Sequence, residues 1–292
     1  MEIGLFLGCN MPAIRPDVER AIRATMPGLG VDLVDLEGYV CCPAFGTFPS
    51  TDDDSHLGVS GWNLSLAEKK GLDLMVECGS CYSSLKSARE HILENEDRKA
   101  RVNELLEPVG RSVEGNAHVR HITDVLYNEV GLEKIKEKIG KSLEGMHAVV
   151  QYPCHTLFPS EVVGFDSPPA RPHILRELVE ALGAEVDSFS REYQCCGGAG
   201  GFHNISALEA QEYTRQKLDA IKNETRADVI VVSCITCLMH LDNVQKQLSK
   251  GNGAYSIPVL DYNQLLALCM GFDAKEVASV SSVPREAVTD RI

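Results

Sequence analysis

Eleven cysteines are the residues of this 292-residue chain best suited to do chemistry. Ten of them fall into two sets with the same order: one cysteine, then an adjacent pair, then a Cys-x-x-Cys. The gaps are 31 and 35 residues in the first set, and 40 and 37 in the second. The first set is Cys9, Cys41, Cys42, Cys78 and Cys81, and the second is Cys154, Cys195, Cys196, Cys234 and Cys237. Such a repeated spacing indicates an internal duplication.

The adjacent pairs narrow the chemistry that these thiols can do. Neighbouring Cα atoms lie about 3.8 Å apart, below the range of about 4.4–6.8 Å for a relaxed disulfide. A zinc site takes four ligands and separates paired cysteines by about two to four residues. A thioredoxin-like dithiol uses only a Cys-x-x-Cys and leaves the other six thiols without a role. An iron–sulfur cluster has several neighbouring irons and thiolate ligands, so it accommodates adjacent cysteines.

A glycine-rich loop follows the second adjacent pair, where residues 193–201 read YQCCGGAGG. Glycines let backbone N–H groups come close to a negatively charged thiolate cluster, although a tight turn would also need them. The loop does not match a dinucleotide-binding fingerprint. The first set is followed instead by PAFGTFPS, with one glycine, so we expect the two sites to differ in access.

Two further residues could take part in this chemistry: a cysteine outside the repeated pattern and a histidine next to it. Cys269 lies in the apolar stretch YNQLLALCM, where a thiol is typical core filler. His155 directly follows Cys154. It is expected either to supply a proton near the site or to pack against it as a hydrogen-bonded histidine.

Composition limits the class of partner and the compartment. The formal net charge is −14, which disfavours nucleic acid and anionic membrane surfaces. No apolar run approaches the roughly 20 residues that cross a bilayer, and the N-terminus has no basic segment typical of a signal peptide. We therefore expect a soluble, cytoplasmic protein, where cysteines more often bind metal or do redox work than form disulfides. The odd number of cysteines also argues against a fully paired disulfide scaffold.

Short apolar runs of buried-strand type precede the cysteines. In each half the pattern reads strand, helix, strand, cysteine pair, helix, strand, Cys-x-x-Cys, helix, strand, helix. It predicts an α/β fold of two duplicated halves, each a small, mostly parallel sheet flanked by helices. The cysteines then gather at the carboxyl edge of each sheet. The predicted strand runs are 2–8, 31–36, 72–77 and 119–128 in the first half, and 147–153, 184–189, 228–233 and 257–266 in the second.

Helical periodicity supports this pattern in both halves, and the charged stretch 132–145 separates them. We expect one helix after Cys9 and another before Gly183, each with one apolar face. The domains are therefore predicted to span residues 1–145 and 146–292. The expected apolar faces are Ile14, Val18, Ile22 and Met26 in the first helix, and Ile174, Leu178, Val179 and Leu182 in the second.

The repeated pattern resembles the cysteine-rich CCG domain family, and the second copy carries the literal Cys195, Cys196 and Gly197. Two tandem copies without a fused domain are similar to the family of B-type subunits of heterodisulfide reductase, although the 40-residue gap is slightly longer than usual. The resemblance implies two noncubane [4Fe-4S] clusters, one held by each set of five cysteines named above.

The resemblance also implies a reaction and partners. The reaction is reduction of the mixed disulfide of coenzyme M and coenzyme B in methanogenesis. The electrons come from a ferredoxin-like iron–sulfur subunit and a flavin subunit, with hydrogenase or formate dehydrogenase further upstream. The chain has no CxxCxxCxxxCP run for ordinary cubane clusters, so we expect it to depend on a docked electron donor.

Three alternatives remain at this point. The chain could serve electron transfer alone, as in succinate, glycolate or lactate oxidoreductases with CCG domains. It could instead reduce another disulfide or sulfur compound, or be a zinc-bound scaffold without redox chemistry. An anionic substrate needs basic side chains, and Arg15, Lys86 and Arg191 lie near the cysteine motifs.

Overall fold

The computed structural model describes residues 1–198, 202–249 and 255–292. These residues form two four-stranded sheets, one in each half, with strand orders β2-β1-β3-β4 and β6-β5-β7-β8. Every pairing is parallel, as the α/β prediction requires. The strands are β1 (Glu2–Phe6), β2 (Asp32–Asp35), β3 (Leu74–Val76), β4 (Val119–His121), β5 (His147–Gln151), β6 (Glu185–Val186), β7 (Val229–Val232) and β8 (Val259–Asp261).

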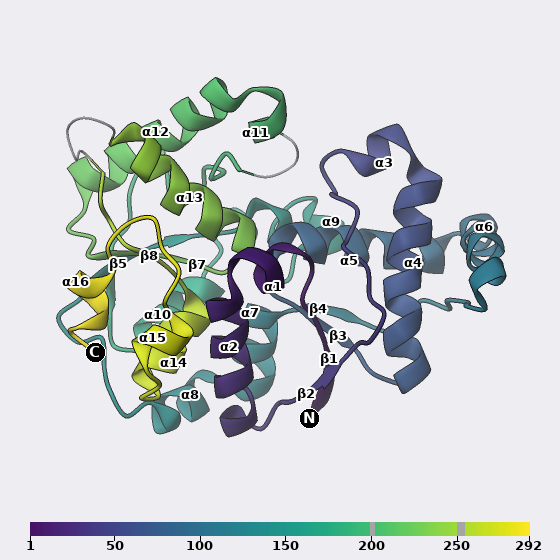
Figure 1. Ribbon diagram of the computed structural model, residues 1–292, viewed down its shortest axis with the longest axis horizontal. Helices are drawn as coiled ribbons and strands as arrows, with labels where there is room; N and C mark the ends of the chain where they lie inside the picture. The colour runs from purple at the N-terminus through teal and green to yellow at the C-terminus, as the bar shows by residue number, and fades with distance from the viewer. Residues whose placement is uncertain (199–201, 250–254) are drawn as a thin grey trace.

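Helices connect the strands of the first half and lie on both sides of its sheet (Figure 1). The longest, α4, begins after Asp52, whose side chain accepts a hydrogen bond from the Ser55 N–H, and ends at Gly71 with φ of 67°. The helical segments are α1 (Asn10–Ile14), α2 (Pro16–Thr25), η1 (Pro27–Leu29), α3 (Phe48–Thr51), α4 (Asp53–Lys70), α5 (Gly79–Glu94), α6 (Glu96–Leu106), η2 (Glu107–Val109), α7 (Ile122–Asp124), η3 (Val125–Val130) and α8 (Leu132–Lys138).

The second half repeats this order of elements. Its last long helix, α14, is fixed by a capping box in which Asp261 and Gln264 each bond to the other's backbone. The helical segments are η4 (Cys154–Thr156), α9 (Ser160–Val163), α10 (Ile174–Ala181), α11 (Phe202–Ile205), α12 (Ala207–Glu224), α13 (Ile235–Leu248), α14 (Tyr262–Cys269), α15 (Ala274–Val277) and α16 (Glu286–Thr289).

The helix predicted after Cys9 is two helices, and the prediction for Ile14 is wrong. Ile14 is the last residue of α1 and is 45% exposed. The break has a local cause, because Pro16 lacks an N–H and Arg15 before it adopts a non-helical φ of −126° and ψ of 53°. The other residues of this predicted face are buried: Val18, Ile22 and Met26.

The second predicted helix is confirmed as α10. Its apolar face is buried, and Gly183 follows it with φ of 98°. A side chain at Gly183 would come within 2.2 Å of the Ser142 hydroxyl, so this turn needs glycine for two reasons.

The two halves exchange their last helices. Helix α14 of the second half packs against α2 of the first half (Figure 1), and the Gln264 amide donates a 2.7 Å hydrogen bond to the Asp17 carboxylate. In the opposite direction, α7 packs against α10, and the Tyr127 hydroxyl of η3 donates a 2.6 Å bond to Glu177. The predicted boundary at residue 145 falls between α8 and β5, and the halves as separate domains stay a prediction.

Within the residues described, no helix has both the length and the apolar character needed to cross a bilayer.

Candidate metal centre

The first cysteine set gathers beyond the carboxyl ends of β1 and β3, where parallel sheets form their sites. The Sγ atoms of Cys42 and Cys81 lie 2.9 Å apart, and the thiol of Cys41 interacts with those of Cys42 and Cys9. Cys9 and Cys41 are exposed, whereas Cys78 and Cys81 are buried. The structure therefore brings this set together, with one side open to solvent.

The second set occupies the equivalent edge of the other sheet. The Sγ atoms of Cys154 and Cys195 lie 3.8 Å apart, and Cys196 interacts with Cys195 and Cys237. Cys196, Cys234 and Cys237 are buried. This set is thus more enclosed than the first, in agreement with the expected difference in access.

Each Cys-x-x-Cys lies at the start of a long helix. Cys78 is the residue before α5, and Cys234 is the residue before α13. The positive end of a helix dipole favours the thiolate form of cysteine. Of the four thiols in these motifs, Cys78 is the one whose pKa is lowered in the structure.

The two sets meet at the boundary between the halves. The Gly79 N–H donates a 3.3 Å hydrogen bond to the Cys234 Sγ, and the Cys78 Sγ lies 3.5 Å from the Thr236 hydroxyl. Hydrogen bonds from Cys234 and Cys81 hold the pKa of Cys78 well below its usual range. The ten thiols therefore lie in two groups that touch.

Neighbouring thiols stabilise individual thiolates in both sets. Hydrogen bonds from Cys41 and Cys81 lower the pKa of Cys42 to about 5. Hydrogen bonds from Cys154 and Cys196 hold the pKa of Cys195 well below its usual range. Metal ligands must be deprotonated, so Cys42, Cys78 and Cys195 are favoured in the form that binds metal. Neighbouring thiols and burial instead raise the pKa of Cys81, Cys234 and Cys237, which must lose their protons when a metal group is loaded.

Backbone N–H groups point at sulfur after the second adjacent pair, as predicted. The Gly197 N–H lies 3.3 Å from the Cys195 Sγ, and the Gly198 N–H lies 3.4 Å from the Cys196 Sγ. A Cβ at Gly198 would come within 2.6 Å of the His240 Cβ, so a side chain does not fit there. The remaining residues of this predicted loop, 199–201, lie outside the described part of the chain.

The donor set fits a polynuclear iron–sulfur group. All eleven cysteines are free thiols, and soft thiolates are the usual ligands of such clusters. Among the described residues, no three His, Cys, Asp or Glu side chains are placed to hold a single metal ion. A cluster spreads its ligands over several irons, which suits adjacent cysteines better than a single zinc does.

A buried carboxyl pair beside the cysteines escaped the sequence analysis. Glu77 and Asp261 are fully buried and interact with each other. Burial and the neighbouring Asp261 raise the pKa of Glu77 well above its usual value, so the pair holds a proton. Glu77 also accepts a 3.1 Å hydrogen bond from the Ile235 N–H. The available signal was an acidic residue closing the apolar run that ends at Cys78.

His155 packs beside the site as expected, although its ring Nδ1 does not make the expected hydrogen bond to a described residue. Its ring meets Phe45 edge to face at 5.6 Å, and its Nδ1 is buried without a hydrogen-bond partner. Burial lowers the pKa of His155. A proton-donating role for this residue stays a prediction.

Cys269 is buried within α14, which agrees with its expected place in the core. The three basic candidates are engaged elsewhere. Arg15 is buried and lies 3.2 Å from Asp17, Lys86 lies 3.3 Å from Glu90, and Arg191 donates to Gln194. None of the three lines the small pocket described next.

A pocket of about 230 Å³ lies beside the second set and borders on both halves. Asn10, which follows Cys9, and Thr236, between Cys234 and Cys237, are among its lining residues. His203 and His240 also line it, with ring centroids 5.2 Å apart. Since its walls are neighbours of both cysteine sets, this pocket can hold a small molecule close to both.

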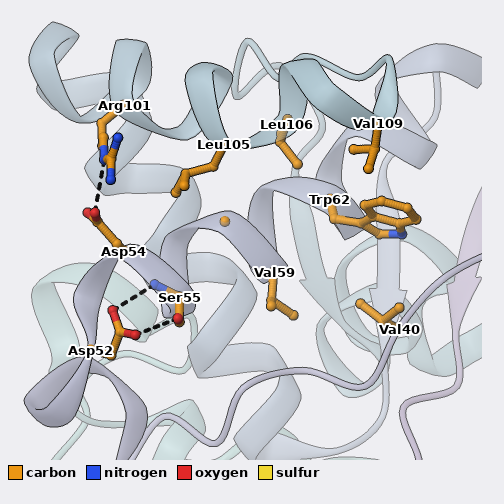
Figure 2. A pocket seen from close by; sticks show the side chains of 11 residues that line it. Val40, Asp52, Asp54, Ser55, Val59, Trp62, Arg101, Leu105, Leu106 and Val109 are labelled. Atoms are coloured by element: carbon orange, nitrogen blue, oxygen red, sulfur yellow. Dashed lines mark hydrogen bonds and ion pairs between the residues drawn. The ribbon is translucent and has the colours of Figure 1, made fainter.

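A second pocket, of about 540 Å³, has a mostly apolar wall without cysteines. Figure 2 shows it between α4 and the α6–η2 segment, with Trp62, Leu105 and Val109 around it. Polar groups occupy one end, where Arg101 and Asp54 form an ion pair of 2.9 Å. This pocket has no redox-active group, so it is not the candidate centre.

Comparisons with known proteins agree with this geometry. The model of the CCG family, described as a cysteine-rich domain, matches residues 3–86 and 148–242. A protein of Archaeoglobus profundus, named as similar to the B-type subunit of heterodisulfide reductase, is 45% identical over 100% of this chain and 98% of that protein. The B-type subunit of the ferredoxin/F(420)H(2)-dependent CoB-CoM heterodisulfide reductase of Methanosarcina acetivorans is 37% identical over 94% of this chain and 91% of that protein.

Two further similarities are more distant. The 8-methylmenaquinol:fumarate reductase membrane anchor subunit of Wolinella succinogenes is 31% identical over 94% of this chain and of that protein. A hypothetical protein from Helicobacter pylori has a similar crystal structure, with a TM-score of 0.73 and 13% identity over 96% of this chain and 51% of that chain. The latter similarity concerns the fold alone.

Proposed function

Because the chain belongs to the cysteine-rich CCG domain family, among relatives named as the B-type subunit of heterodisulfide reductase, we propose that it is the catalytic subunit of such a reductase. Its substrate is the mixed disulfide of coenzyme M and coenzyme B. The S–S bond takes up two electrons and two protons, and two thiols leave. The observation that carries this proposal is the contact between two complete five-cysteine sets across the two halves.

Each set is proposed to hold one noncubane [4Fe-4S] cluster. When bound, the two clusters supply the two electrons and Lewis-acidic irons for the departing sulfurs. The first is held by Cys9, Cys41, Cys42, Cys78 and Cys81, and the second by Cys154, Cys195, Cys196, Cys234 and Cys237. The stabilised thiolates and the N–H groups of Gly197 and Gly198 support this assignment.

The protein's own contribution is to bind and orient the disulfide. The pocket beside the second set, which Asn10 extends to the first half, offers space near both sets, and we propose that it orients a bound disulfide for reaction. Among the described residues that line this pocket there is no lysine or arginine, and its two histidines are His203 and His240. Burial lowers the pKa of His240 to about 4, so this ring is neutral. The identity of the two coenzymes is therefore proposed from the names of the relatives. The proposed cleavage of a disulfide is based on the two cysteine sets.

Electrons are proposed to enter at the first set, because Cys9 and Cys41 are exposed. The donor is a ferredoxin-like iron–sulfur subunit, which receives electrons from a flavin subunit. Hydrogenase or formate dehydrogenase supplies that flavin in the cytoplasm of a methanogen. The relatives named as subunits of larger reductases support an assembly of several different chains.

The decisive experiment measures thiol release from the coenzyme M–coenzyme B disulfide. Protein purified without oxygen, with its iron and sulfide content determined, is given a reduced viologen dye. Two thiols should appear for every two electrons consumed. Cys234→Ala should abolish release, while Cys269→Ala, which changes a core thiol outside both sets, should retain it.

The similarity to the Wolinella succinogenes protein favours a second candidate function, electron transfer within another oxidoreductase. Protein that holds both clusters, accepts electrons and releases no thiol from the heterodisulfide would support this candidate over the first. A panel of other disulfides in the same assay separates it from a reductase with a different substrate.

A further inference from the structure

Lys217 is a buried cation that the chemistry described above does not use. It lies on α12 in the second half and is 1% exposed. Its ammonium donates a 3.1 Å hydrogen bond to the Glu192 carbonyl and lies 5.3 Å from the centre of the Phe189 ring. A buried ammonium is costly unless negative charge or hydrogen bonds compensate it.

The surroundings place this ammonium beside the second cysteine set. Thr214 lies one turn before Lys217 on the same helix face, and its hydroxyl is 2.8 Å from the Cys196 carbonyl oxygen. Glu192, which accepts from Lys217, lies three residues before Cys195. The side chain of Lys217 thus extends from α12 to the segment that leads into Cys195 and Cys196.

The charges around Lys217 agree with this position. Burial lowers the pKa of Lys217 to about 8, and negative charge on Cys196, Cys237 and Cys195 acts in the opposite direction. The carboxylate of Glu192 is already paired with Arg176 at 3.0 Å. The charge of the cysteine set therefore acts on the Lys217 ammonium more strongly than the Glu192 carboxylate does.

The first half has no such cation at the matching place. Helices α4 and α12 both have 18 residues and both precede the central strand that leads to a Cys-x-x-Cys. Counted from the helix start, Asn63 holds the position of Lys217. Asn63 is also buried, and its side-chain oxygen accepts a 2.9 Å hydrogen bond from the Val40 N–H, just before Cys41. Both residues anchor the loop before a cysteine pair, but only Lys217 can bring a charge.

We propose that Lys217 makes the cluster held by the second cysteine set a stronger electron acceptor than the cluster held by the first. This inference rests on the proposed function insofar as both sets bind clusters. In this exchange the first cluster would lose one electron and be oxidised, and the second would take it up and gain one negative charge. A further electron from the iron–sulfur partner would reduce the first cluster again. The ammonium stabilises the reduced form of the second cluster over its oxidised form, so it raises that cluster's reduction potential.

The test is a reductive titration of purified holoprotein with dithionite, followed by electron paramagnetic resonance. Cys196→Ala, which removes a proposed ligand, assigns the signal of the second set. In Lys217→Gln the charge is lost, but the amide can still donate to the Glu192 carbonyl. We expect the midpoint potential of the second cluster to fall by about 59 mV in Lys217→Gln. For a one-electron couple this is a change of about tenfold in the equilibrium between the clusters, so that the electron stays more often on the first. The midpoint of the first cluster should stay unchanged.

Two matched variants separate charge from structure. Lys217→Arg keeps a buried cation and should keep the wild-type midpoint of the second cluster. Lys246→Gln removes one positive charge from an exposed position of the same half, where solvent and salt screen it. Its shift should therefore be much smaller than that of Lys217→Gln.

An unchanged midpoint in Lys217→Gln, with full iron content, would overturn the proposal. If Lys217→Gln does not retain iron, the iron content of Lys217→Met is measured as well. Loss of the second cluster in both neutral variants, but not in Lys217→Arg, supports the proposal that the positive charge of Lys217 stabilises this cluster. Loss in all three variants overturns the proposal in favour of a structural anchor. Thiol release is measured separately, so wild-type protein with two clusters and no release refutes the proposed function without touching this result.

Discussion

The backbone N–H of Gly79 donates a 3.3 Å hydrogen bond to the Sγ of Cys234, which belongs to the other half of the chain. The reciprocal position behaves in a similar way, because the N–H of Ile235 donates to the Glu77 carboxyl group at 3.1 Å. The first residue of each Cys-x-x-Cys helix thus bonds to the opposite half. The two thiol sets are structurally one unit.

A larger residue at Gly79 should disturb both sets at once. A Cβ there would meet the Pro153 Cβ at 3.0 Å and the Cys234 Sγ at 3.6 Å, and the branched side chain of Gly79→Val would push the halves apart. We expect this variant to lose iron from both sites, measured as iron and sulfide per chain. Gly140→Ala is the control, since a Cβ at Gly140 meets nothing within 4 Å. Full iron content in Gly79→Val would contradict this prediction.

Cysteine substitutions should separate ligands from core thiols. Holoprotein is expected to contain about eight irons per chain, about four for each proposed cluster. Cys196→Ala should disturb the second cluster and leave the first, whereas Cys269→Ala should leave the iron content unchanged. Iron analysis with electron paramagnetic resonance of each variant checks this. Equal loss in the two variants would show that the ligand assignment is wrong.

The exchanged helices should make the two halves unfold together. Gln264 is fully buried and donates to Asp17 at 2.7 Å and to the Val277 carbonyl at 2.9 Å. Gln264→Leu removes donors from both acceptors, so we expect a loss of about 1–3 kcal/mol in the free energy of unfolding. Urea unfolding followed by circular dichroism should still show a single transition.

Lys136→Ala is the matched control, because it removes an exposed pair with Glu133 and should change the stability by less than about 1 kcal/mol. Two separate transitions in Gln264→Leu, with one midpoint unchanged, would mean that the halves are independent.

His121 should make the protein sensitive to acid. Its Nε2 donates to the Glu77 carbonyl at 2.9 Å, so its Nδ1 accepts from Thr123 and the ring is neutral. Burial lowers the pKa of His121 to about 4, against about 6.5 in the unfolded chain. The unfolded state therefore binds more protons between these values, and stability is lost as the pH falls from about 6.5 to 4. The full loss is about 3 kcal/mol.

His121→Gln keeps a donor for the Glu77 carbonyl but cannot take up a proton. Its free energy of unfolding should fall less steeply between pH 7 and pH 5 than that of the wild type, measured by urea unfolding at each pH. His118→Gln, at an exposed position, should retain the wild-type slope. Equal slopes in wild type and His121→Gln would refute the assignment.

Local patterns predicted the order of strands and helices well, because apolar runs and cysteine spacing are properties of neighbouring residues. The gathering of the thiols followed from parallel strands sharing one edge. The break at Pro16 was missed because periodicity outweighed the proline signal. Glu77 was missed although it closes an apolar run, and Lys217 could not be found, because a charged residue in a sequence is normally exposed. Only tertiary packing shows that these two are buried.

The exchange of α14 onto α2 also sets the order in which this protein can mature. Helix α2 ends at Thr25, and the helix that covers it begins at Tyr262. During synthesis, the apolar face of α2, which includes Val18 and Ile22, therefore stays exposed until α14 has been translated and almost the whole chain has left the ribosome. The first cysteine set is also translated early, but its contacts with Cys234 and Thr236 of the second half can form only late in synthesis. A metal group held by this set would therefore be best inserted after translation, once the two halves have packed together.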